Sequence, residues 1–275
     1  MLDKVREEKI LILAKTYPSP SAQYVETSCV AGISSSGEMR RLFPVPFRMI
    51  EEGKQFSKWQ WIDVRVEKAR KDHRPESHRL YVDTIACGER IETKNGWSAR
   101  RTWLDKIPTF ESLDEMDVCR QATGLSLGLL RPKNVRLEIR PARNQDWSPV
   151  ELAKLMQPEQ GSLFDEAEAK AQIKVLQKIP YDFYYVYTVQ GREGDVECCH
   201  KIVDWEAGAL YLKCRWSHGP GWERPFRAML DDTLTGKDLM FLMGNQHRFP
   251  GQWLLISLIY PPKLTLAQPL QPSLF

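Results

Sequence analysis

Residues 9–17 read KILILAKTY, a compact apolar run that ends at Pro18-Ser-Pro20. An apolar run of this length, bounded by turn-forming residues, predicts a buried β-strand. Residues 24–33 and 39–45 lie on either side of the turn Ser34-Ser-Ser-Gly37, an arrangement that predicts a β-hairpin. Residues 59–66 alternate large apolar with polar residues, and 79–85 repeat this pattern. Several short strands separated by turns predict a small β-barrel at about residues 1–95.

The following segment, residues 96–178, has a helical pattern with one strand at 134–140. Helices are expected at 98–107, 112–123 and 165–178, the first two opening with a serine that can cap the helix. Ser148-Pro-Val-Glu151 combines a capping serine, a proline in the first turn and a glutamate three residues on, which predicts a further helix start.

Residues 179–260 predict a C-terminal α+β domain, and residues 261–275 a flexible Pro-rich tail. Strands are expected at 181–190, 196–205, 238–244 and 253–260, with helices at 205–215 and 225–234. The predicted class is α+β: an N-terminal small β-barrel, OB-like or related, followed by a helical segment and a C-terminal mixed α/β unit.

Composition favours a globular protein of the cytoplasm. Hydrophobic residues make up 42% of the chain and charged residues 27%, close to the globular average. No apolar stretch is long enough to cross a bilayer, and the first nine residues are charged where a secretory signal needs apolar ones. Six cysteines without paired spacing favour reduced thiols. We therefore expect a cytoplasmic protein with no membrane association.

No phosphate loop, dinucleotide turn, nucleophile elbow or zinc-protease helix is present, so whether the chain is an enzyme stays open. One cluster of metal-ligating types could hold zinc, formed by Cys199, His200, Cys214 and His218. Against this reading, the cysteines lack the Cys-x-x-Cys spacing of structural zinc sites, and adjacent Cys198 and Cys199 in a strand would point to opposite faces. His200, Asp204 and Glu206 could also act as acid/base or magnesium-binding groups, but Asp204 equally suits the cap of a helix starting near Trp205. The main interpretation therefore includes no cofactor.

The first half of the chain is basic and rich in aromatic residues. Residues 40–101 hold 15 Lys or Arg against 9 Asp or Glu. Cationic groups neutralise phosphates and exposed aromatic faces stack on unpaired bases, so the composition suits DNA or RNA. The alternative is that the aromatics form core and the charges solvate the surface. The expected contacts are Arg40, Arg41, Arg48, Lys58, Arg65, Arg100 and Arg101 to phosphates, and Trp59 or Trp61 to bases.

Two short resemblances accompany these patterns. Ile10-Leu-Ile-Leu-Ala14, Cys29-Val-Ala-Gly-Ile33 and Gly37-Glu-Met-Arg-Arg41 resemble the opening of the dual OB-containing domain family of bacterial conflict systems, although Met39 stands where that family has tryptophan. This resemblance implies an OB-like barrel and no specific activity.

The second resemblance is at Gln271-Pro-Ser-Leu-Phe275, which is similar to the Gln-x-x-Leu-Phe peptide that docks bacterial proteins on the DNA sliding clamp. It implies partner contacts by Gln271, Leu274 and Phe275. Gln160-Gly-Ser-Leu-Phe164 repeats the pattern.

The leading hypothesis is a non-catalytic nucleic-acid-binding accessory or sensor protein in bacterial DNA defence or maintenance. One alternative is a metal-dependent hydrolase of nucleic acid that uses the Cys198–His218 region. Another is a protein-interaction module that docks a partner enzyme.

Overall fold

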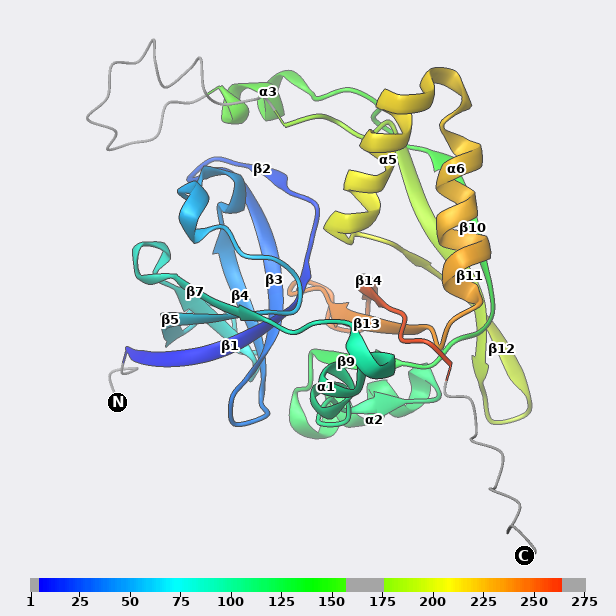
Figure 1. The fold of residues 1–275 in the computed structure, drawn as a ribbon, viewed down its shortest axis with the longest axis horizontal. Helices are drawn as coiled ribbons and strands as arrows, with labels where there is room; N and C mark the ends of the chain where they lie inside the picture. Colours follow the sequence, from blue (N-terminus) through cyan, green and yellow to red (C-terminus); the bar gives the residue numbers. More distant parts are fainter. Residues whose placement is uncertain (1–4, 157–175, 264–275) are drawn as a thin grey trace, which may run out of the picture.

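The computed structural model describes residues 5–156 and 176–263. The first third of the chain forms a barrel, and the remainder forms a second unit of two sheets with flanking helices (Figure 1). The α+β class predicted from the sequence is confirmed. Within the described ranges, no helix is both long and apolar enough to cross a membrane.

Five strands close the barrel: β1 (Arg6–Lys15), β3 (Val25–Ser34), β4 (Met39–Val45), β5 (Gln60–Lys68) and β6 (Ser77–Leu80). Their hydrogen-bonded order is β1-β3-β4-β6-β5, and β5 pairs back with β1. β4 and β6 run parallel, whereas the other neighbours are antiparallel. This five-stranded Greek-key arrangement is OB-like, as predicted. Two short strands are added outside the ring, β2 (Ser19–Ser21) on β3 and β7 (Ala86–Arg90) on β5.

The barrel closes because alternate residues on each strand are apolar and point inward. Ile10 and Ile12 of β1 are fully buried in the interior, and the alternating residues Leu11 and Leu13 point outward into a different core. The interior is completed by the side chains of Val30, Leu42, Ile62, Val64, Val66 and Leu80.

The second unit begins with α1 (Lys94–Leu104) and α2 (Leu113–Thr123), which lie below β9 in Figure 1. Its first sheet has the order β14-β13-β9-β8, with β8 (Thr109–Phe110), β9 (Leu127–Leu130), β13 (Met240–Asn245) and β14 (Trp253–Ile259). This sheet packs on the outward face of the barrel, where Leu11, Leu13 and Ile33 share one core with residues of β9, β13 and β14.

The other sheet has the order β10-β11-β12, with β10 (Lys133–Pro141), β11 (Tyr181–Gln190) and β12 (Asp195–Lys201). Tyr185 and Tyr187 of β11 point toward the first sheet and Phe183 toward α5 (Trp205–His218) and α6 (Glu223–Arg227), in one large core. The short helix α3 (Pro149–Leu155) contacts β2 and β3.

This packing has a consequence for ligands. OB barrels commonly bind through the face that is centred on their second and third strands. Here that face belongs to β3 and β4, and much of it is buried against the second unit: Ala31 and Ile33 are at most 1% exposed. This part of the barrel surface is therefore not open to a ligand.

Most predicted helix starts are confirmed. Ser112 caps α2, Ser148 and Glu151 form a capping box on α3, and Asp204 caps α5. The start predicted at Ser98 also agrees with the structure: α1 is assigned from Lys94, but Asn95, Gly96 and Trp97 have left-handed backbone angles, with φ of 50°, 62° and 68°, so the regular right-handed helix begins only after them.

Two predicted strands are shorter than expected. β6 ends at Leu80 and a 3-10 turn follows at Val82–Thr84, while β12 ends at Lys201. Most of the helix predicted at 165–178 lies outside the described residues.

Candidate nucleic-acid interface

The two arginines that open the predicted contact set are buried and paired within the protein. Arg40 is 7% exposed, and its guanidinium donates to Glu8 at 2.7 and 3.2 Å and to Glu38 at 2.7 Å. Arg41 is 4% exposed and donates to the carbonyl and hydroxyl oxygens of Ser126. Both guanidinium groups are therefore taken up by hydrogen bonds within the protein.

Lys58, Arg100 and Trp59 are also buried. The Lys58 ammonium donates to the carbonyl of Leu258 at 2.7 Å and to Glu206 at 3.3 Å. Arg100 lies between the rings of Trp59 and Trp97, 4.8 and 4.7 Å from their centroids. These groups join the barrel to the second unit.

The remaining predicted cations differ in their surroundings. Arg48 forms an ion pair with the buried Glu26 at 3.4 Å. Arg101 pairs with Asp238 and donates to the carbonyl of Pro262. Arg65 is exposed on β5, with its guanidinium 5.4 Å from the ring centroid of Tyr81.

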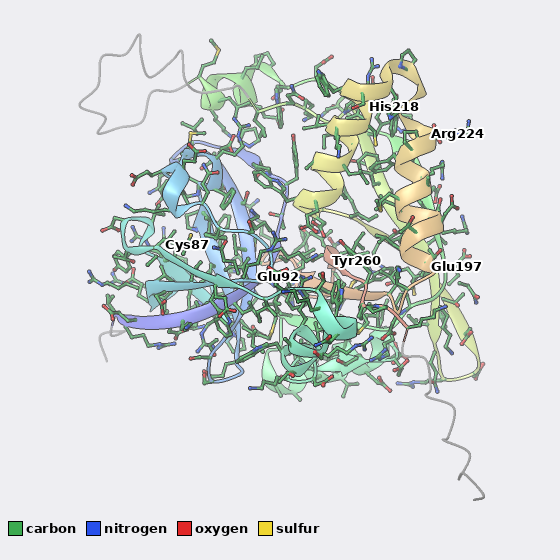
Figure 2. All side chains as sticks on the ribbon, in the orientation of Figure 1. Cys87, Glu92, Glu197, His218, Arg224 and Tyr260 are labelled. Atoms are coloured by element: carbon green, nitrogen blue, oxygen red, sulfur yellow. The ribbon has the colours of Figure 1, made fainter. Side chains whose placement is uncertain are left out.

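The four residues considered for zinc do not come together. Within residues 5–156 and 176–263, no group of three or more His, Cys, Asp or Glu side chains could hold a metal ion. Cys214 is buried in the core, and His218 lies at the far end of α5, well separated from Glu197 on β12 (Figure 2). Cys199 is exposed beside Arg140, and the ring of His200 meets the Tyr187 hydroxyl at 2.9 Å. Burial lowers the pKa of His200, so its ring favours the neutral form.

The residues predicted for partner binding, Gln271, Leu274 and Phe275, lie outside the described residues, as does the second copy of the motif at 160–164.

One predicted aromatic residue does reach the surface. Trp61 points outward from β5, and its ring packs edge-on against Trp103 of α1 with 4.8 Å between centroids. Both rings are partly exposed. The Lys9 ammonium lies 5.7 Å from the Trp61 ring, and that of Lys106 lies 4.2 Å from the Trp103 ring. We call Trp61 and Trp103 the tryptophan pair.

A polar hollow of about 700 Å³ lies beside the tryptophan pair and shares Lys9 with it. The start of β1, the β3–β4 turn and residues of the β5–β6 segment form its walls. Ser34, Ser35 and Ser36 supply hydroxyl groups. The charged lining is mixed, with Arg6, Lys9, Arg40, Lys68, Glu7, Glu8 and Glu38.

The acids of this hollow are largely neutralised by Arg40. Burial alone would raise the pKa of Glu8, but hydrogen bonds from Arg40 and Arg6 hold it below its usual value. The hydrogen bond from Arg40 likewise lowers the pKa of Glu38. Both carboxylates are therefore ionised and already paired, and Lys9 faces solvent beside the tryptophan pair.

Sequence reasoning identified Trp61 and missed its neighbours Trp103, Lys9 and Lys106 as one site. Lys9 is 52 residues from Trp61 in sequence, and only the pairing of β1 with β5 brings them together. Trp103 contacts Trp61 because α1 folds back over the barrel edge.

The fold and this site define a class: an OB-like barrel joined to a second α+β unit. The chain belongs to the family described as Domain of unknown function (DUF8757), whose model matches residues 107–275. Residues 6–106, which include the barrel, match Domain of unknown function (DUF8758). The two matches meet between Lys106 and Ile107.

No curated protein matches the chain. A chain in the solved structure titled "Structure and Conformational Change of a Replication Protein A Heterotrimer Bound to ssDNA" is 8% identical, with a TM-score of 0.24. The match covers 94% of this chain and 66% of that one, just under two thirds of its length. A similarity this low carries no argument about function.

Proposed function

We propose that this protein binds single-stranded nucleic acid at one end of its barrel. The observation that supports the proposal is the tryptophan pair, whose two partly exposed indole rings lie edge to face with a lysine beside each. Base stacking on an aromatic side chain contributes about 1–3 kcal/mol per base and tolerates any sequence.

The two lysines are suited to binding the phosphates of the same strand. Its ammonium sits on a flexible four-carbon stem, so Lys9 and Lys106 can swing from the indole rings to the phosphates of a strand whose bases take their place. Because stacking requires unpaired bases, the site should prefer single strands to duplexes. We also propose that the protein acts in the cytoplasm, where thiols stay reduced, because all six of its cysteines are free.

The test is fluorescence anisotropy with labelled single-stranded DNA, single-stranded RNA and duplex DNA at low salt. Trp61→Ala and Trp103→Ala should each weaken single-strand binding by about 5- to 150-fold, the equivalent of one lost stacking contact. Trp216→Ala is the matched control, because Trp216 is 88% exposed on α5, away from the barrel end.

Both tryptophans also pack at the edge of the core, so their replacement lowers stability as well as affinity. Substitutions of the neighbouring lysines test binding without this loss of packing. Lys9→Glu and Lys106→Glu should weaken binding while thermal unfolding stays unchanged, and Lys213→Glu on α5 should leave both as they are. A wild-type protein that binds no single strand at low salt, or tryptophan variants that bind like wild type, would overturn the proposal.

A further inference from the structure

Two loops from the two family-matched parts of the chain are fixed to each other. The first, residues 69–76, joins β5 to β6, and the second, residues 246–252, joins β13 to β14. The Arg74 guanidinium donates to the backbone carbonyl and side-chain oxygen of Asn245 at 2.7 and 3.1 Å. The ring of His247 meets Asp72 at 3.3 Å. We call residues 69–76 and 246–252 the loop pair.

Asp72 organises the base of the loop pair. It accepts hydrogen bonds from Arg74 at 2.6 and 2.9 Å and from the Ser77 hydroxyl at 2.8 Å. Burial would raise its pKa, but these hydrogen bonds hold the pKa well below its usual range. Asp72 is therefore ionised and neutralises Arg74, so neither charge is left for a ligand.

The tips of the loop pair are different. Arg70, Lys71 and Arg248 are exposed, and within the described part of the chain none has an acidic partner within 4 Å. Phe249 is 56% exposed beside Arg248. Its position is set by the turn, in which the Gln252 amide donates to the Phe249 carbonyl at 2.8 Å. Three uncompensated cations thus accompany an aromatic ring in solvent.

The loop pair also borders the polar hollow. Pro75, within the first loop, lines that hollow together with Lys9, which contacts the tryptophan pair. The hollow therefore lies between the tryptophan pair and the loop pair. The second loop follows on from the first, since His247 meets Asp72.

We infer that the loop pair is a second nucleic-acid contact, in which Arg70, Lys71 and Arg248 neutralise phosphates and Phe249 stacks on a base. This inference rests on the proposed function, and it makes both family-matched parts of the chain contribute to one binding path. An exposed aromatic ring among cations fits a strand with bases better than an acidic peptide, which offers charge without stacking.

The experiment measures the affinity of the full chain for oligothymidylates of 4 to 24 nucleotides. Wild-type affinity should rise with length until the strand reaches both contacts. Phe249→Ala should weaken binding of the longest strand by about 5- to 150-fold and leave the shortest unaffected. Arg248→Glu should act in the same direction. Arg224→Glu, on the exposed side of α6 in Figure 2, is the charge control and should change nothing.

The outcomes are distinguishable. Absence of wild-type binding at every length would defeat the proposed function itself. Wild-type binding with Phe249→Ala and Arg248→Glu both unaffected at 24 nucleotides would overturn only the inference. Tighter binding of a polyglutamate peptide than of the 24-mer, lost in Arg248→Glu, would also overturn it and identify an acidic protein partner.

Discussion

Arg41 of the barrel donates hydrogen bonds of 2.8 and 3.2 Å to the carbonyl and hydroxyl of Ser126, which directly precedes β9 of the second unit. Ser126 in turn donates through its amide and hydroxyl to the two carboxylate oxygens of Glu76, at 2.9 and 2.8 Å. All three residues are buried. This network crosses the boundary between the two family matches, which predicts that the two parts unfold together.

Arg41→Met should therefore lower the free energy of unfolding by about 1–3 kcal/mol, because it leaves the buried carbonyl of Ser126 without the hydrogen bond that Arg41 donates. Urea unfolding followed by circular dichroism measures this. Arg65→Met, on the exposed face of β5, is the control and should cost less than about 0.5 kcal/mol. A two-step unfolding curve for the wild-type protein would contradict the coupling.

Gly32 of β3 pairs with Ile12 and lies close against β1. A Cβ there would lie 2.6 Å from both the Ile10 side chain and the backbone oxygen of Leu11. Because the backbone of a closed barrel cannot yield easily, Gly32→Ala should destabilise the fold by about 3 kcal/mol or more. Gly53→Ala, at a site with open space, is the matched control. Similar melting temperatures for the two variants would contradict this reading of the barrel.

The strands were predictable because a strand with one buried face alternates apolar and polar residues, and this alternation can be read from the sequence. The contacts between residues far apart in the chain were not predictable in this way. Arg40 and Arg41 resemble surface cations in sequence, and their burial depends on Glu8 and Ser126, which are distant in the chain. Composition reports residue types and carries no information on which face a second sheet will cover.

Trp59 and Trp61 illustrate the same limit at short range. Strict alternation would give both rings the same face of β5. Trp59 has a φ of 67°, so the backbone turns just before β5 begins and the alternation does not extend back to it. Its ring is 2% exposed, whereas that of Trp61 reaches the surface.

Lys15 gives the protein a specific pH dependence. Its ammonium lies 3.6 Å from the Phe47 ring centroid and donates to the carbonyl of Phe56. Burial lowers its pKa from 10.5 to about 8, against the opposing effect of Glu206 and Asp204. Between these values the unfolded chain binds the proton more readily, so the contribution of Lys15 to the free energy of unfolding rises with pH.

The measurement compares wild type with Lys15→Met in urea at several pH values from 7.5 to 10.5. The stability of wild type relative to the variant should increase across this window by roughly 2 kcal/mol, somewhat less than the full shift implies because the side chain is partly exposed. Lys213→Met, exposed on α5, should show no such trend. A difference that is flat or falls with pH would contradict the burial of this ammonium.

The salt dependence of binding counts the cations that a bound strand neutralises. The path uses five cations that face solvent: Lys9, Arg70, Lys71, Lys106 and Arg248. For single strands each neutralised phosphate contributes about 0.7 to the slope of log affinity against log salt, so the wild-type slope should be about −3.5.

Single substitutions then identify which of these cations contact a phosphate. Arg248→Gln should make the slope less steep by about 0.7, because one fewer counterion is released. Arg224→Gln should leave the slope unchanged, because Arg224 is exposed on α6, outside the proposed path. Anisotropy titrations between 20 and 300 mM salt measure both slopes. If the slope stayed constant with Arg248→Gln, or changed as much with Arg224→Gln, Arg248 would not neutralise a phosphate and the strand would not reach the loop pair.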